Sequence, residues 1–249
     1  MLEYVFDRAI QRYRYADSGK FVGQKAIENL TVKAIVQVEG DITTITNLLI
    51  EGKITVGTWE DTTRSALKNL HTWNYLLGAG GEKQMTQSDY GALGQKIKQE
   101  YKYLRGLAQE LVEGKVTEAQ LRARMAQYTA SGGTTHELGR AKSHQKAGYF
   151  WEKRIRTKLN SCESCYRYAE MLWQPIDTLP EAGQKCECRS NCGCYKVFSR
   201  NLTKPGDSIL EQGFGWLGKL PTRKYDIRQT DAVRLIRSIS VRSIDSTPK

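Results

Sequence analysis

Apolar residues recur every three or four positions along a long stretch of the chain that begins at Gln24. This spacing places them on one side of an α-helix, as in an amphipathic helix packed on a core. We predict helices over about 24–51, 59–77, 88–112 and 117–131, with a last helical stretch near 134–148. Gly52 is expected to end the first helix and the glycines at 78, 80 and 81 the second, and Gly132-Gly133 to break or bend the fourth.

Two predicted helix junctions have closely similar sequences, Leu48 to Thr55 and Glu110 to Thr117. In each, a glycine suits a left-handed C-terminal cap, an apolar residue follows, and a threonine can cap the next helix. Gln120, three residues after Thr117, completes a capping box. The similarity indicates two equivalent helical corners, produced by duplication or by convergence.

Residues 4–23 show the alternating pattern of β-structure instead. Tyr13 and Tyr15 alternate with arginines, Asp17 to Gly19 supplies a turn, and an apolar pair follows. Because an isolated two-stranded hairpin is marginal in water, we expect this hairpin or arm to pack on the protein's own body or on a neighbour.

These patterns predict a mainly α (α+β) protein built around a helical bundle. Four regions are expected: an N-terminal β-hairpin or arm over 1–23, a helical body over 24–157, a Cys-rich knuckle over 158–200, and an extended C-terminal tail over 201–249. Within the tail, one short amphipathic stretch runs from Ala232 to Ile239.

The composition is that of a globular protein, with 39% hydrophobic and 26% charged residues. Since no segment resembles a membrane span or a secretory signal, we expect folding in a cytoplasm and no membrane partner. The net charge of +11 is uneven: residues 1–139 hold 17 basic and 16 acidic side chains, and residues 140–249 hold 21 and 11. A basic C-terminal half favours an anionic partner, or serves solubility alone.

All six cysteines fall in one short region, at positions 162, 165, 186, 188, 192 and 194. A C-x2-C pair with further cysteines about 20 residues downstream is the spacing of a zinc site, and a reducing cytoplasm keeps thiols free for metal. The preferred ligands are Cys162, Cys165 and Cys188 with either Cys192 or Cys194, which leaves Cys186 as the spare. Disulfides formed in oxidising surroundings, unligated packing thiols and an iron–sulfur cluster are the alternatives.

Such a zinc ion is expected to be structural, because a catalytic zinc keeps an open position and usually has histidine or carboxylate ligands. The three histidines, His71, His136 and His144, all lie outside the cysteine region. The sequence contains no phosphate-binding glycine loop, serine-hydrolase elbow or H-E-x-x-H motif. We therefore expect no enzyme activity and no small-molecule substrate.

Basic residues flank the cysteines and suggest a second function. The candidates for contacts with DNA phosphates are Lys153, Arg154, Arg156, Lys158 and Arg189. With the cysteines, they lead to an alternative hypothesis, a DNA-binding zinc knuckle.

Residues 134–198 resemble the C-terminal segment of the tailed-phage minor head protein family, also called the head-morphogenesis family. In that family an Arg-rich stretch precedes a C-x2-C pair, a proline–glycine loop and a closing cysteine group. Here the order is Lys153 to Arg156, then Cys162 and Cys165, then Pro180 to Gly183, then Cys188 to Cys194. The extra Cys186 and the absence of a histidine ligand depart from the family pattern.

The resemblance implies a structural, non-catalytic virion component that is present in few copies. Such a protein acts in head assembly near the portal, with portal and major capsid proteins as partners and DNA as a further candidate. It is assembled into the virion in the host bacterial cytoplasm. A neck, tail or decoration role is the structural alternative.

Overall fold

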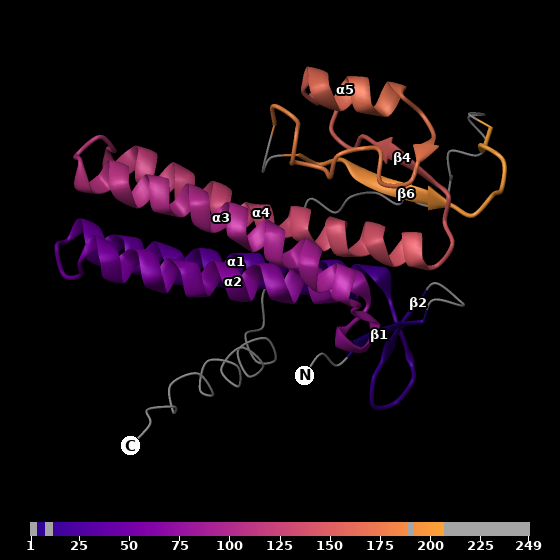
Figure 1. The fold of residues 1–249 in the computed structure, drawn as a ribbon, viewed down its shortest axis with the longest axis horizontal. Helices are drawn as coiled ribbons and strands as arrows, with labels where there is room; N and C mark the ends of the chain where they lie inside the picture. Colours follow the sequence, from indigo (N-terminus) through magenta and orange to yellow (C-terminus); the bar gives the residue numbers. More distant parts are fainter. Residues whose placement is uncertain (1–3, 8–11, 189–191, 207–249) are drawn as a thin grey trace. The chain divides into compact units, whose positions relative to one another are not determined.

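The computed structural model describes residues 4–7, 12–188 and 192–206, and this part of the chain is mainly helical (Figure 1). The predicted mainly α class with small β-elements is confirmed. The described helices are α1 (Gln24–Ile50), α2 (Val56–Ala79), a 3-10 turn η1 (Glu82–Gln84), α3 (Gln87–Val112), α4 (Glu118–Lys146) and α5 (Glu163–Glu170).

The two predicted helical corners have the same construction, one between α1 and α2 and the other between α3 and α4. Gly52 and Gly114 both adopt a left-handed conformation, with φ of 68° and 67°. Thr55 and Thr117 cap the helices that follow, and each hydroxyl accepts a hydrogen bond from a backbone N–H three residues on. The predicted corners are confirmed. They could be predicted because the residues within each corner determine its backbone conformation.

The apolar stripes of the four long helices meet in one core. Its buried members are Ile42, Trp59, Leu67, Leu70, Leu104, Leu107, Ala108, Leu121 and Met125. Trp59 is fully buried and still satisfies its indole N–H, which donates to the Thr46 hydroxyl at 3.2 Å. Burial of a full Trp or Leu side chain contributes about 1.5–3 kcal/mol, so this cluster is the main source of stability in the bundle.

Helices α2 and α4 approach each other closely at glycines, and the predictions about the glycines of these helices are confirmed only in part. Left-handed Gly80 caps the end of α2 as predicted, but Gly78 lies inside this helix, and α4 runs without a break through Gly132-Gly133. A methyl group on Gly139 would lie 2.5 Å from the carbonyl oxygen of Tyr75. At Gly78 and Gly139 the facing backbone leaves no room for a Cβ, and at Gly132 the side chains of the facing helix fill that space.

The N-terminal strands β1 (Tyr4–Asp7), β2 (Arg12–Tyr15) and β3 (Phe21–Val22) form an antiparallel sheet in the order β1-β2-β3. The predicted strand–turn–strand is confirmed as β2 and β3, and β1 adds a third strand. The Tyr13 hydroxyl donates to the carbonyl of Leu77 at 2.8 Å, so the sheet packs on the end of α2.

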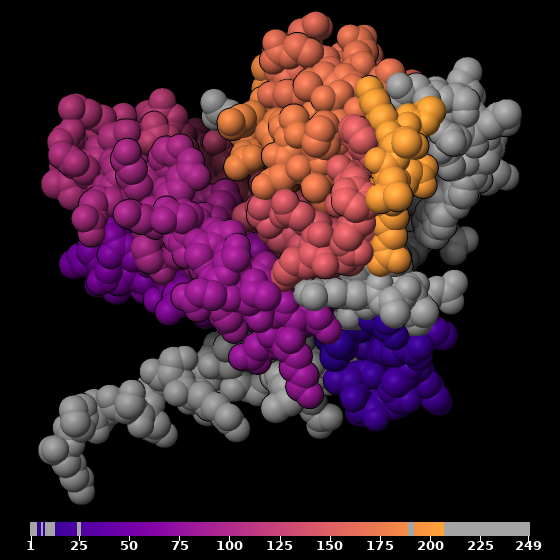
Figure 2. All heavy atoms as spheres, turned by 45° about the vertical axis from the view of Figure 1, so that its right-hand side comes forward, coloured from indigo at the N-terminus to yellow at the C-terminus, as the bar shows by residue number. Residues whose placement is uncertain are grey.

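A second antiparallel sheet has the order β5-β4-β6, with β4 (Trp151–Ile155), β5 (Gln174–Pro175) and β6 (Tyr195–Ser199). The predicted helical body extended to residue 157, but its last segment is the central strand β4 and pairs with β6. We call residues 151–199 the cysteine module. Figure 2 shows its salmon and orange residues packed as one continuous mass beside the magenta helices.

Helix α4 contacts the cysteine module along its second half. The Arg140 guanidinium donates to the carbonyl of Lys196 at 2.5 Å, and the Thr134 hydroxyl donates to the carbonyl of Ala182 at 3.2 Å. These bonds join the bundle to both β6 and the loop that carries Cys186 and Cys188.

Of the predicted tail, only residues 201–206 belong to the described part, so the amphipathic stretch from Ala232 to Ile239 lies outside it. None of the described helices combines the length and the apolar character needed to cross a membrane.

Candidate metal centre

The register of the second sheet brings the two halves of the cysteine motif together. Antiparallel pairing of β4 with β6 places Ile155 opposite Tyr195, so the chain leaving β4 lies beside the chain entering β6. The Thr157 hydroxyl donates to the carbonyl of Gly193 at 2.6 Å and joins these two segments just before the cysteines. The C-x2-C pair and the closing cysteines therefore meet at one end of the sheet.

Helix α5 determines the positions of the first two thiols. Cys162 is its N-cap residue, Cys165 lies in its first turn, and the Cys165 N–H donates to the carbonyl of Cys162 at 2.9 Å. The second group arrives on the loop after a turn at Gly183, which adopts a left-handed φ of 84°. The Tyr168 hydroxyl donates to the carbonyl of Lys185 at 3.2 Å and holds this loop against α5.

The cysteine sulfurs lie close to one another. The Cys165 Sγ is 3.5 Å from that of Cys188 and 3.6 Å from that of Cys192, and the Cys186 Sγ is 3.3 Å from that of Cys188. Four thiolates at the corners of a tetrahedron around zinc, each about 2.3 Å from the ion, lie about 3.8 Å apart. The observed separations are close to this value.

Among the six cysteines, all of which lie in the described residues, none forms a disulfide. A disulfide requires its sulfurs to be about 2.05 Å apart, well below the separations found here. The expectation that the cysteines gather into one potential metal site is confirmed. The identity of the metal stays a prediction.

The structure adds Cys186 to the predicted candidate ligands. The sulfurs of Cys162, Cys165, Cys186 and Cys188 all lie within 4.8 Å of one another, so Cys186, the predicted spare, lies in a group that could hold a metal ion. The Cys186 and Cys188 sulfurs lie on the same side of the loop, 3.3 Å apart. Cys192 and Cys194 form a second group with Cys165.

The thiols differ in acidity. Burial raises the pKa of Cys162, but the backbone N–H groups of Cys165 and Cys188 outweigh it and lower that pKa to about 7. Burial and the neighbouring thiols raise the pKa of Cys165. Because a bound cation replaces the thiol protons, a metal ion would stabilise the thiolates that this crowding disfavours.

Two of the predicted DNA-binding residues are buried and cannot contact a phosphate. Lys153 is 5% exposed, with its ammonium near the ring of Trp173, and Arg154 is 1% exposed. Both lie in β4, the central strand of the sheet, where each face is covered. Arg156 and Lys158 are exposed, and Arg189 lies outside the described residues.

The cysteine module also contains a buried ion network that sequence reasoning missed. The Lys196 ammonium donates to Glu152 at 3.0 Å, to Glu181 at 2.8 Å and to the carbonyl of Leu179 at 2.6 Å. Burial raises the pKa of Glu181, and the charge of Lys196 opposes that rise. No sequence signal pairs these residues, because only the strand register and the loop after β5 bring them together.

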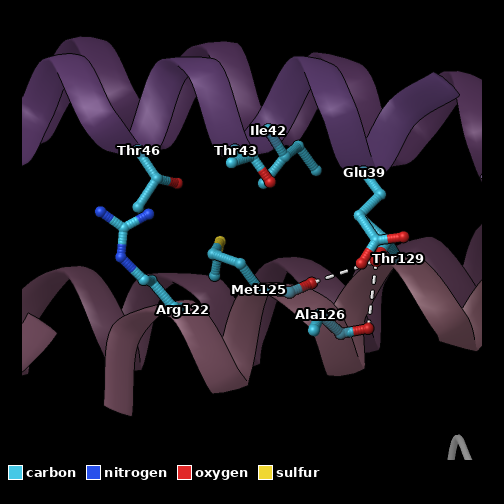
Figure 3. Close-up of a pocket in the computed structure, with 8 residues that line it drawn as sticks. All are labelled: Glu39, Ile42, Thr43, Thr46, Arg122, Met125, Ala126 and Thr129. Carbon is cyan, nitrogen blue, oxygen red and sulfur yellow. Dashed lines mark hydrogen bonds between the residues drawn. The ribbon is translucent and has the colours of Figure 1, made fainter. Parts of the chain in front are cut away.

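Away from the cysteines, a small pocket lies between α1 and α4, with Arg122 and Glu39 at opposite ends (Figure 3). The Thr129 hydroxyl in its wall is bonded to the backbone carbonyls of Met125 and Ala126. Arg122 is paired with Glu118 at 2.7 Å. These groups already serve the helices, so we assign the pocket no chemistry.

Comparison of the chain with models of known protein families, with curated proteins and with solved structures found no match. The function is therefore inferred from the arrangement of the chain's own residues. Within the described part, the cysteine cluster at the end of the second sheet is the feature with the clearest chemistry.

Proposed function

We propose that this protein is a structural, non-catalytic component of a tailed-phage particle, a minor head protein, whose cysteine module is held by zinc. The observation that carries the proposal is the meeting of the C-x2-C pair of α5 with Cys186 and Cys188. An all-thiolate set of four ligands saturates a tetrahedral zinc ion and leaves no position for a substrate or an activated water. Zinc therefore contributes folding energy.

The histidines support a structural role for the site. His71 is fully buried in the bundle, His136 is buried in α4, and His144 stacks on Phe198 with ring centroids 4.2 Å apart. Burial lowers the pKa of His71 to about 3 and that of His144 to about 4, so both are neutral packing groups at physiological pH. A nucleophilic thiolate requires a nearby base, and these rings serve other contacts.

The phage assignment rests on the order of motifs along the module: a basic strand, a C-x2-C helix cap, a proline–glycine loop and a closing cysteine group. In this proposal the helical bundle contacts portal or major capsid proteins, and zinc holds the cysteine module rigid against α4. The protein is then a part of the virion.

Two measurements test this role. Quantitative mass spectrometry of purified particles is expected to find the chain at a few copies per portal ring, and purified protein is expected to co-sediment with portal oligomers. A Cys165→Ser variant is expected to co-sediment less, and a Tyr103→Ser variant on the exposed face of α3 serves as the surface control. Absence of the chain from particles, together with no binding to portal or capsid protein, would refute the role.

One observation favours DNA binding as a second function of the same module. The exposed Arg156 guanidinium stacks on the ring of Tyr166 at 3.7 Å, and Lys158 lies two residues away. A basic group presented on an aromatic ring suits contact with a nucleic acid backbone. Each phosphate neutralised on duplex DNA adds about 0.9 to the slope of log K against log salt.

The salt dependence of duplex binding separates the two functions. If the module binds DNA, Arg156→Ala with Lys158→Ala reduces the salt slope, whereas Lys115→Ala at the exposed α3–α4 corner leaves it unchanged. Binding that is absent, or that does not vary with salt, removes this second function and leaves the structural role intact.

A further inference from the structure

The six sulfurs form two overlapping groups. Together they offer more ligands than one metal ion can use. One group is Cys162, Cys165, Cys186 and Cys188, and the other is Cys165, Cys192 and Cys194. A single tetrahedral ion takes four thiolates and would leave two thiols idle beside it. Cys194 is buried, 8% exposed, and Cys192 is 3.6 Å from Cys165, so the two remaining thiols lie within the cluster.

Two of the sulfurs lie at the centre of the cluster. Cys165 interacts with Cys162, Cys188, Cys192 and Cys194, and it belongs to both groups. Cys188 is 3.5 Å from Cys165 and also interacts with Cys186, Cys162 and Cys192. The other four sulfurs lie around this central pair. Six thiolates in this arrangement give each of two ions four ligands when the central pair is shared.

We propose that the cysteine module binds two divalent metal ions bridged by the thiolates of Cys165 and Cys188. The first ion takes Cys162 and Cys186 as terminal ligands, and the second takes Cys192 and Cys194. This inference deepens the structural zinc role proposed above and rests on it. Binding two ions releases six thiol protons to solvent, and no oxidant or reductant takes part.

The charge around the site fits such a cluster. Six thiolates and two divalent ions carry two net negative charges, which requires a cation nearby if the cluster is buried. Arg154 is 1% exposed, and its Nε and Nη1 groups have no hydrogen-bond partner among the described residues. Its charge acts on Cys194, and its remaining Nη2 group donates to the carbonyl of Pro180. Buried N–H groups beside Cys194 are suited to donate to thiolates, as outer partners of metal ligands do.

The test is a metal count on the full chain, purified in reductant without chelator and dialysed against zinc. We expect two zinc ions per chain by elemental analysis and no thiol that reacts quickly with a disulfide reagent. Cadmium-substituted protein is expected to give two cadmium-113 resonances that are coupled through the bridging sulfurs. The double variant Cys192→Ser, Cys194→Ser is expected to retain one ion. If that variant fails to fold, the cadmium spectrum of the unmutated chain still tests the two-ion cluster.

The outcomes separate this inference from the function it rests on. One zinc per chain with two reactive thiols would overturn the two-ion cluster and leave a single structural zinc in place. No bound metal at all would overturn both.

Discussion

The buried ammonium of Lys196 gives the sharpest test of how the cysteine module is held together. Its side chain is 1% exposed and donates to two carboxylates, of Glu152 and Glu181, and to the carbonyl of Leu179. Lys196→Met keeps the length and most of the apolar volume of the side chain and removes the charge and all three hydrogen bonds. The variant therefore isolates the electrostatic contribution of this group.

The expected loss is large because the partners stay buried. Glu152 is fully buried and Glu181 is 5% exposed, so the variant holds two carboxylates that no longer face a cation. Removing one partner of a buried ion pair costs about 3–5 kcal/mol, whereas an exposed pair contributes at most about 1 kcal/mol. The matched control is Lys142→Met, which breaks the solvent-exposed pair with Asp177.

The assay is urea unfolding with hydrogen exchange measured by mass spectrometry on peptides of β4 and β6. We expect Lys196→Met to lower protection of these strands by about 3–5 kcal/mol and Lys142→Met to change it by less than about 1 kcal/mol. The pKa of Glu181 is raised by burial, and loss of the cation raises it further, so the penalty should shrink as the pH falls and this carboxylate takes up a proton. A penalty below 1 kcal/mol, or one that does not shrink in acid, would refute the reasoning.

Two further predictions concern the helical bundle. Gly139→Ala is expected to destabilise the bundle by about 1–3 kcal/mol in urea unfolding, because the new Cβ would lie 2.5 Å from the Tyr75 carbonyl oxygen. Gly94→Ala, at an open position of α3, is the control and should stabilise the protein by up to about 1 kcal/mol. Equal effects of the two substitutions would contradict the close contact. Burial lowers the pKa of His71 from 6.5 to about 3, so on acidification the unfolded chain takes up this proton before the folded chain does. The free energy of unfolding should therefore decrease as the pH is lowered from 6.5 towards 3, by up to about 5 kcal/mol. His71→Gln should flatten that part of the curve, and an unchanged acid slope in the variant would count against it.

The parts of the fold that sequence predicts are those that local chemistry determines. The corners at Gly52 and Gly114 need a left-handed residue and a threonine cap, and both signals lie within eight residues. The helix stripes likewise follow from spacing alone.

The errors arise where distant segments meet. Gly78 and Gly132 resemble helix breakers in sequence, yet their role is decided by the facing helix. Lys153 and Arg154 resemble a solvated basic stretch, yet they are buried because both faces of the sheet are covered at β4. Tertiary contacts override local patterns at each of these positions.

The candidate site shows the same division. The C-x2-C spacing identifies a thiolate site, but which cysteines join it depends on the turn at Gly183 and on the register of β6. Spacing alone leaves Cys186 as the spare cysteine, whereas the folded chain places its sulfur among the candidate ligands.

X-ray absorption at the zinc edge of the purified, reduced protein tests the central claim most directly, because it reports the atoms bound to the metal. The thiolate centre predicts a shell of four sulfur atoms at about 2.3 Å and no nitrogen or oxygen neighbour. A zinc shell containing nitrogen or oxygen, or protein that binds no zinc while its thiols are reduced, would contradict it.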